Sequence, residues 1–162
     1  MRVSVQMSMA CEPSVVWGLI TEIERIGEFS PECAEAWWVA GSPAHAAGGR
    51  FEGRNRFEAN GDTYEWTRPC DVVAYEAPRL FAYTVGDRFD GTPASRWAFR
   101  ITPAKTGCLV EQEFEHFPDG LSGARLQAEQ LDDPETFIAE RRDALRDGMR
   151  QTLERIRAVA ES

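Results

Sequence analysis

Four polar side chains that can bind oxygen atoms or move protons lie among aromatic residues in this chain: Asn55, Arg68, Gln112 and His116. An arginine can hold a developing enolate oxygen, and histidine is the side chain that titrates nearest neutrality, so Arg68 and His116 are the catalytic candidates. Sequence spacing places no serine or cysteine beside His116 to act as a nucleophile. Catalysis, ligand binding and a buried hydrogen-bond network are therefore all open interpretations of these residues.

The alternation of residue types predicts which side chains face the interior, because residues two apart on a strand share a face. The inward set consists of Phe51, Asn55, Phe57, Tyr64, Trp66, Arg68, Phe81, Tyr83, Trp97, Phe99, Gln112, Phe114 and His116, with Met149 added from the C-terminal helix. Each aromatic residue alone is better explained by a core. The four polar groups are more than a sealed core tolerates, since each unpaired buried polar group costs roughly 1–3 kcal/mol.

Strands are the elements that position most of this set. Residues 3–9 alternate in polarity and predict a strand, and Glu12-Pro13-Ser14 then opens a helix because proline suits a first turn. Gly27 and Pro31 end that helical segment. Further period-two segments predict strands at residues 34–40, 51–58, 64–68, 80–85, 95–102 and 108–116. Asn60-Gly61 predicts a hairpin turn, and Pro69 a bulge or an edge.

One long helix is predicted from Pro134 to Ala160, after a polar segment from Asp119 to Pro134 that glycine and proline interrupt. Its apolar stripe consists of Ile138, Leu145, Met149, Leu153, Ile156 and Ala160. Gly148 and Thr152 lie beside the stripe, where small residues either allow close packing or leave space. Consecutive hairpins favour an antiparallel sheet whose apolar face the helices cover, an α+β fold with a cavity between helix and sheet.

Composition excludes several function classes. The chain has 162 residues, 43% of them hydrophobic, and a net charge of −9, so it suits one domain and lacks the basic surface of a nucleic-acid binder. No apolar run approaches the ~20 residues needed for membrane insertion.

Lys105 is the only lysine, which leaves few candidates for a Schiff base. The four cysteines and two histidines are too far apart in sequence to predict a metal site, and no cofactor is predicted. Without a signal peptide, reduced cysteines and a cytoplasmic location are expected.

Five motifs in a definite order carry a resemblance to a known family: Glu12–Trp17, Thr21–Pro31 with its Glu28-Phe29-Ser30-Pro31 end, Gly48–Arg56, Tyr64–Trp66 and Gly148–Leu153. In this order the chain resembles the START-like (SRPBCC) superfamily, specifically its polyketide cyclase/dehydrase and lipid-transport branch. The resemblance covers nearly the whole chain. It implies a helix-grip fold, in which a curved antiparallel sheet of six to seven strands surrounds a long C-terminal helix and two short helices follow the first strand. Residues 1–162 would then form a single START-like ligand-binding domain.

The resemblance also implies a hydrophobic or aromatic small-molecule ligand, lipid or polyketide-like, bound by a monomer or homodimer. A non-catalytic carrier or sensor is the favoured function; a polyketide cyclase/dehydrase is the alternative, and an interaction protein with an incidental pocket is a third. Aromatase/cyclases of this family carry an interior arginine further along the strand of Arg68. Register from Trp66 places Cys70 at that position, so Arg68, one inward step earlier, would have to substitute, which weakens the cyclase interpretation.

Overall fold

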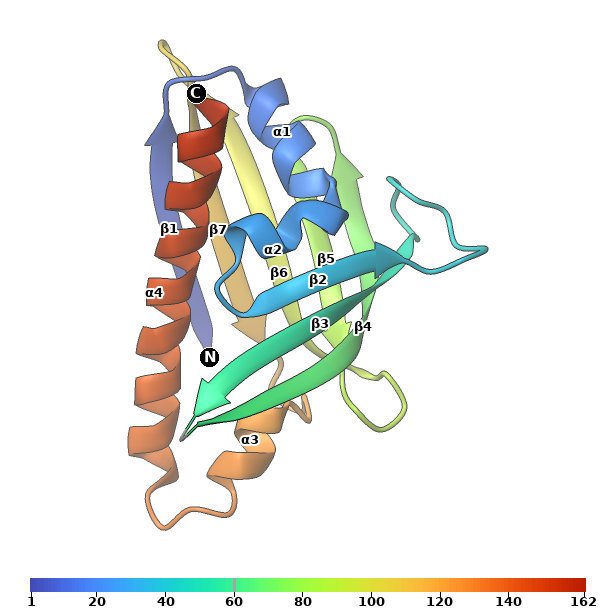
Figure 1. Ribbon diagram of the computed structural model, residues 1–162, viewed down its shortest axis with the longest axis vertical. Coiled ribbons are helices and arrows are strands. Elements are labelled where there is room, and N and C mark those ends of the chain that lie inside the picture. The colour runs from blue at the N-terminus through green and yellow to red at the C-terminus, as the bar shows by residue number, and fades with distance from the viewer. Residues whose placement is uncertain (60) are drawn as a thin grey trace.

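A seven-stranded antiparallel sheet and a long C-terminal helix frame the protein in a computed structural model (Figure 1). The structure describes residues 1–59 and 61–162. The strands are β1 (Arg2–Met9), β2 (Cys33–Trp38), β3 (Arg50–Ala59), β4 (Asp62–Glu76), β5 (Leu80–Gly86), β6 (Pro93–Pro103) and β7 (Cys108–His116). The helical elements are α1 (Pro13–Thr21), the 3-10 turn η1 (Ile23–Arg25), α2 (Ile26–Phe29), α3 (Gly123–Ala128) and α4 (Pro134–Ala160).

The strand order is β1-β7-β6-β5-β4-β3-β2, and every neighbouring pair is antiparallel. The sheet curls so that β2, β3 and β4 pass across the front of the molecule, while α1, α2 and α4 lie on its concave side (Figure 1). The predicted α+β helix-grip fold is confirmed.

The helix α4 begins and ends at the residues that its sequence predicts. Pro134 occupies the first turn, and the Asp133 side chain caps the helix by accepting a hydrogen bond from the Thr136 N–H at 3.1 Å. Leu145, Met149 and Leu153 are buried against the sheet, as the apolar stripe predicts.

Two local features differ from the sequence interpretation or fall outside it. The polar segment before α4 contains the short helix α3, whose first turn is capped by the Ser122 Oγ accepting from the Arg125 N–H at 3.2 Å. Six residues are too few for a helical period to be recognised in sequence. Gly61 has the positive φ of 85° that a tight turn needs, whereas Asn60, the other half of the predicted turn, lies outside the described residues.

The strand β4 changes from an edge strand to an inner strand along its length. Its ladder with β3 runs from Asp62 to Asp71, but its ladder with β5 begins only at Cys70. Pro69, which cannot donate a ladder hydrogen bond, therefore stands where β4 is still an edge. The turn end of the β3–β4 hairpin consequently projects beyond β5 as an arm, along which β2 pairs with β3 only as far as Asn55.

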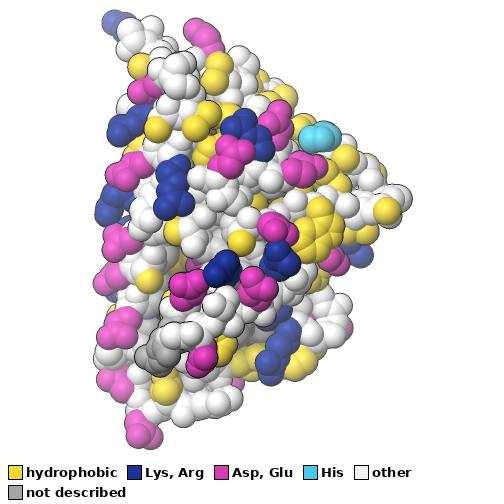
Figure 2. Space-filling model, in the orientation of Figure 1, with side chains coloured by type: hydrophobic (Ala, Val, Ile, Leu, Met, Phe, Trp, Pro, Cys, Tyr) yellow, Lys and Arg dark blue, Asp and Glu magenta, His cyan; other side chains and the backbone are white. Residues whose placement is uncertain are grey.

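The core fills the concave face in two apolar clusters. The larger contains, among others, Phe51, Phe81, Tyr83, Phe99, Val110, Leu153 and Ile156, and α1 packs on it through Val16 and Ile20. The smaller contains Val3, Phe114, Leu145 and Met149, with Trp97 at its border. Charged side chains of both signs are mixed over the outer surface drawn in Figure 2. None of the helices in the described part of the chain has the length and apolar character needed to cross a bilayer.

Replacing Leu153 tests the assignment of the α4 stripe. Leu153 is 0% exposed, so Leu153→Ala should lower the free energy of unfolding by roughly 2–5 kcal/mol in urea titrations. The matched control is Val159→Ala on the same helix, where a side chain that is 40% exposed should contribute less than about 0.5 kcal/mol. Equal effects of the two substitutions would contradict the assignment.

Candidate ligand-binding site

A small apolar cavity lies between the sheet, α4 and the segment from α1 to α2. Its volume is about 30 Å³, room for roughly two water molecules. The lining residues are Leu19, Ile20, Glu22, Ile23, Ile26, Phe29, Phe51, Phe81, Tyr83, Phe99, Thr152 and Ile156. Four aromatic residues of the predicted inward set, Phe51, Phe81, Tyr83 and Phe99, thus lie together on the sheet side of one cavity.

The aromatic wall of this cavity is a set of mutually packed rings. The Tyr83 ring lies 5.0 Å from the Phe51 ring and 5.5 Å from the Phe81 ring, centroid to centroid. These separations suit edge-to-face packing, which fixes ring orientation. Burial raises the pKa of the Tyr83 phenol well above its usual value, so this residue stays neutral at physiological pH.

The opposite wall comes from α1, η1 and α2, whose residues were not among the predicted inward set. Leu19, Ile20 and Ile23 have helical spacing, which signals burial but not that the buried face borders a space. Thr152 lines the cavity from α4, and its hydroxyl donates to the Gly148 carbonyl at 2.9 Å. Gly148 itself faces Pro31: an added Cβ would lie 3.4 Å from the Pro31 Cγ. Of the two small residues beside the stripe, Gly148 allows close packing and Thr152 leaves space.

The smaller apolar cluster continues the concave face toward α3. The Trp97 and Phe114 rings are 4.8 Å apart, and Met149, only 2% exposed, packs on this cluster from α4. These three members of the predicted inward set therefore lie together, but they do not border the cavity near α1.

Gln112 occupies the strand position between the two clusters. It is 5% exposed, pairs across the sheet with Val5 and Phe99, and its Oε1 is buried with no hydrogen-bond partner among the described residues. Its neighbour Phe99 lines the cavity. A buried amide oxygen without a donor costs roughly 1–3 kcal/mol. Gln112 is one of three described side chains with a buried unpaired polar atom, together with Trp38 (Nε1) and Arg54 (Nε), and it is the one that lies between the two apolar clusters.

Residues of the projecting β3–β4 arm do not enter the enclosed interior. Phe57 and Tyr64 pair with each other near the hairpin end and are 57% and 52% exposed, which corrects the expectation of inward burial. The reason is that strand parity identifies a face but not what covers it, and this part of β4 also lacks β5 as a neighbour in the sheet. Asn55 and Trp66 form the next pair along the arm and are half-buried.

Arg68 follows on the same face of the arm and is half-buried. Its Nη1 donates to the Thr67 carbonyl at 2.8 Å, and its pKa is lowered by burial and by the nearby Arg88. Cys70, at the position where related cyclases have their interior arginine, is 4% exposed, and burial raises the pKa of its thiol. The structure thus places the neutral side chain of Cys70 at the deeper position. The Arg68 guanidinium lies nearer the end of the concave face at the β5–β6 loop and α3, which we call the open end.

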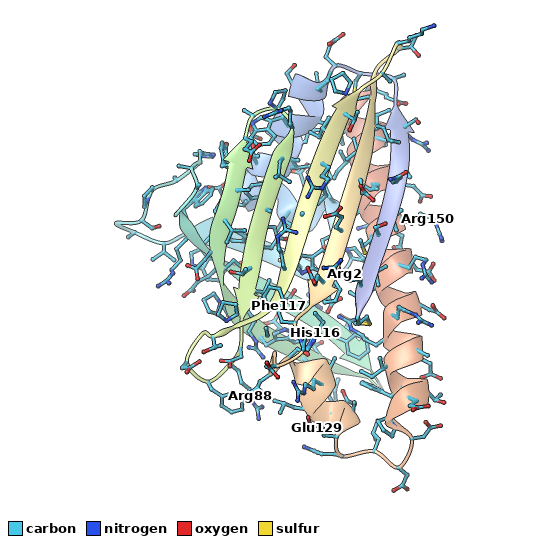
Figure 3. All side chains as sticks on the ribbon, turned by 180° about the vertical axis from the view of Figure 1, so that it is seen from behind. Arg2, Arg88, His116, Phe117, Glu129 and Arg150 are labelled. Atoms are coloured by element: carbon cyan, nitrogen blue, oxygen red, sulfur yellow. The ribbon has the colours of Figure 1, made fainter. Side chains whose placement is uncertain are left out.

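His116 has a partner that sequence spacing did not predict. Its Nε2 lies 2.7 Å from the Oγ of Ser122, the residue that also caps α3. Figure 3 shows His116 and Phe117 at the end of β7 next to α3. The loop between β7 and α3 brings the two side chains together, which a reading of spacing alone could not show. Ser122 Oγ also accepts a hydrogen bond from the Arg125 N–H in the first turn of α3. The His116–Ser122 pair therefore links the end of β7 to the N-terminus of α3, and we call this pair the His116 clasp.

Metal binding finds no support in the described part of the chain, where no group of three or more histidine, cysteine, aspartate or glutamate side chains gathers closely enough to hold an ion. All four cysteines are free thiols.

Comparisons with known proteins agree with this geometry. The family model described as "Polyketide cyclase / dehydrase and lipid transport" matches residues 1–161. The solution structure of the Polyketide_cyc-like protein Cgl2372 from Corynebacterium glutamicum is 27% identical, with a TM-score of 0.67 over 99% of this chain and 91% of that one. The di-domain ARO/CYC StfQ from the steffimycin biosynthetic pathway is 14% identical, with a TM-score of 0.69 over 99% of this chain and 50% of that one. None of the curated proteins compared with the chain matches it.

The His116 clasp predicts a pH dependence of stability. Burial lowers the pKa of His116 from its usual 6.5 in the folded chain, so between the two values the unfolded chain binds more protons. Stability is then complete above the unfolded value and falls as the pH drops toward the folded value. We expect the urea midpoint to fall between about pH 7 and about pH 5, a range above the titration of carboxylates with lowered pKa such as Glu28.

The variant His116→Gln identifies the source of this slope. It removes the titrating group while keeping an amide that can bond to Ser122, so its midpoint should change less over the same pH range than that of the wild type. An identical slope in the variant would show that another group is responsible.

Proposed function

Because the chain belongs to the polyketide cyclase/dehydrase and lipid-transport family, we propose that it binds an apolar or aromatic small molecule between the sheet and α4 as a non-catalytic carrier or sensor. The ligand would lie along the concave face, from the aromatic wall at Phe51 and Tyr83 toward Trp97 and Phe114. The wall offers ring faces and edges, which suit a flat aromatic or polyketide-like molecule.

The unpartnered Gln112 amide is the observation that carries this proposal. A core without a ligand would gain stability from an apolar residue at this position. A ligand hydroxyl beside Gln112 would instead supply the missing donor in surroundings that water does not reach. The proposed ligand is therefore mostly apolar but carries at least one hydroxyl or comparable hydrogen-bonding group.

The small cavity volume implies that binding moves side chains. About 30 Å³ cannot accommodate a ring system, since ligand sites are typically about 300–1,000 Å³. Met149 of α4 packs in the same cluster as Phe114. It is the most adaptable residue along the proposed ligand site, because its unbranched side chain has several low-energy conformations. A ligand would occupy the volume gained when this side chain and the segment from α1 to α2 move aside.

A pair of matched probes tests the proposal. 2-Naphthol should bind and change tryptophan emission, because Trp97 borders the proposed site. 2-Methoxynaphthalene, which lacks the hydroxyl donor, should bind roughly 3–10-fold more weakly, the value of one neutral hydrogen bond.

Replacing Gln112 should remove that difference between the probes. Gln112→Leu should bind both compounds alike and fold at least as stably as the wild type, whereas Gln6→Leu, an exposed glutamine on β1, should keep the preference. If neither naphthalene binds at high micromolar concentration, and fatty acids and polyphenols also fail, the proposal of a ligand site is wrong.

A polyketide cyclase/dehydrase remains the alternative, because the same fold occurs in the di-domain ARO/CYC proteins of two biosynthetic pathways. In such an enzyme an arginine would hold an enolate oxygen and a base would move the proton. Here His116 Nε2 is engaged by Ser122, and Cys70 rather than an arginine occupies the deeper strand position. The missing arginine, and the use of Ser122 as the cap of α3, favour the carrier.

Turnover of a poly-β-ketone analogue separates the two functions. We expect none from the wild type, and altered ligand affinity rather than lost rate from Arg68→Ala and His116→Ala. Cyclisation by the wild type that drops about 10²–10³-fold in both variants, with little change in stability, would establish the enzyme instead.

A further inference from the structure

Two neighbouring arginines at the open end of the concave face lack acidic partners. Most arginines of the chain pair with a carboxylate; within the described residues the exceptions are Arg68, Arg88, Arg155 and Arg157. Arg155 donates to the Phe29 carbonyl, and Arg157 lies in the last turn of α4. Arg68 and Arg88 are different, because burial and the nearby Arg88 together lower the pKa of the Arg68 guanidinium.

The register of the sheet places Arg68 beside the loop that carries Arg88. Cys70 pairs with Val85 and Asp71 with Thr84, so continuation of the same register sets Arg68 opposite Asp87. Contact confirms this continuation at the intervening residue: an added Cβ at Gly86 would lie 2.9 Å from the Pro69 Cγ. Figure 3 shows Arg88 on the loop between β5 and β6, at the end of the molecule that also holds α3.

The one carboxylate opposite Arg68 is already used. Asp87 is 5% exposed, and its Oδ1 accepts hydrogen bonds from the backbone N–H groups of Phe89, Asp90 and Gly91 at 2.9, 3.1 and 3.2 Å. Those three donors stabilise the loop and share the charge of the carboxylate. Asp87 attracts Arg68 at longer range, but no ion pair joins the two among the described residues.

Arg88 is held in place without an ion pair among the described residues. Its guanidinium carbon lies 4.9 Å from the centroid of the Phe89 ring, a cation–π contact that stabilises the cation. The second carboxylate of this loop, Asp90, accepts a hydrogen bond from the Thr92 N–H at 2.9 Å, so both loop carboxylates are bonded to backbone N–H groups. Two guanidinium groups without an ion pair beside an apolar face need an explanation.

We propose that Arg68 and Arg88 bind the carboxylate of an amphipathic acid whose apolar part lies on the concave face between the sheet and α4. This inference rests on the proposed function and adds the chemical class of the ligand: a monocarboxylic acid with an aromatic or aliphatic body. Half-buried Trp66 lies one inward step from Arg68 on the same strand face and would cover the first apolar atoms beyond the head group. Arginine suits this role because its planar donors match the two oxygens of a carboxylate.

An acid and its ester provide the test. 2-Naphthoate should bind at least roughly tenfold more tightly than methyl 2-naphthoate, since charge-assisted hydrogen bonds exceed neutral ones in strength. Arg68→Gln and Arg88→Gln should each weaken binding of the acid by roughly tenfold and leave the ester unchanged. The control is Arg157→Gln, which removes another arginine without an acidic partner and the same unit of charge at the far end of α4, and should alter neither affinity.

The outcomes separate this inference from the proposed function. Equal binding of acid and ester by the wild type overturns the carboxylate site while leaving the apolar site intact. Equal loss of both ligands in Arg68→Gln and Arg88→Gln overturns it too, because the arginines would then act on the fold. Failure of all the naphthalenes, fatty acids and polyphenols to bind refutes the proposed function itself. Arg88 is exposed, so its variant decides the matter even if Arg68→Gln unfolds.

Discussion

The packing of α4 on the concave face sets the dimensions of everything else in this fold. Leu153 and Ile156 close one apolar cluster and Leu145 and Met149 the other, so the helix contacts the sheet on both sides of its middle. Between these contacts stands Thr152, which is shorter than leucine and satisfies its own hydroxyl through Gly148. The cavity lies where α4 has this smaller side chain. Because the Thr152 hydroxyl is already hydrogen-bonded, it needs no partner inside the cavity. A helix with leucine there would fill the site.

On the sheet side, Gln112 differs from Thr152 because its buried oxygen has no hydrogen-bond partner in the described chain. Antiparallel pairing with both β1 and β6 fixes its register, so it cannot turn outward without turning all of β7 with it. The amide therefore stays beneath α4 although nothing in the described chain pairs with its oxygen. A cost of roughly 1–3 kcal/mol is substantial for a domain whose total stability is about 5–15 kcal/mol. Function is the simplest reason for a protein to retain such a residue.

Sequence patterns predicted the fold well and the site only in part. Alternation located β7, and an apolar stripe with a proline start located α4, because both periods extend over many residues. Parity also placed Phe51 and Gln112 on the concave face. It failed for Phe57 and Tyr64 because parity identifies the face of a strand but not whether other elements pack on that face. The Ser122 partner of His116 depends on a loop conformation that no period encodes.

Net charge and local charge act on different scales in this protein. At physiological ionic strength the screening length is about 8 Å, so acidic side chains spread over the surface repel an approaching carboxylate only weakly once it reaches the open end. Arg68 is half-buried, and its field is screened less than that of a fully exposed group. Arg88, exposed on its loop, would meet the anion first, and Arg68 would hold it next to Trp66 and the apolar face. The order of the two arginines along this path, exposed and then half-buried, is what an acid entering with its apolar part toward α4 requires.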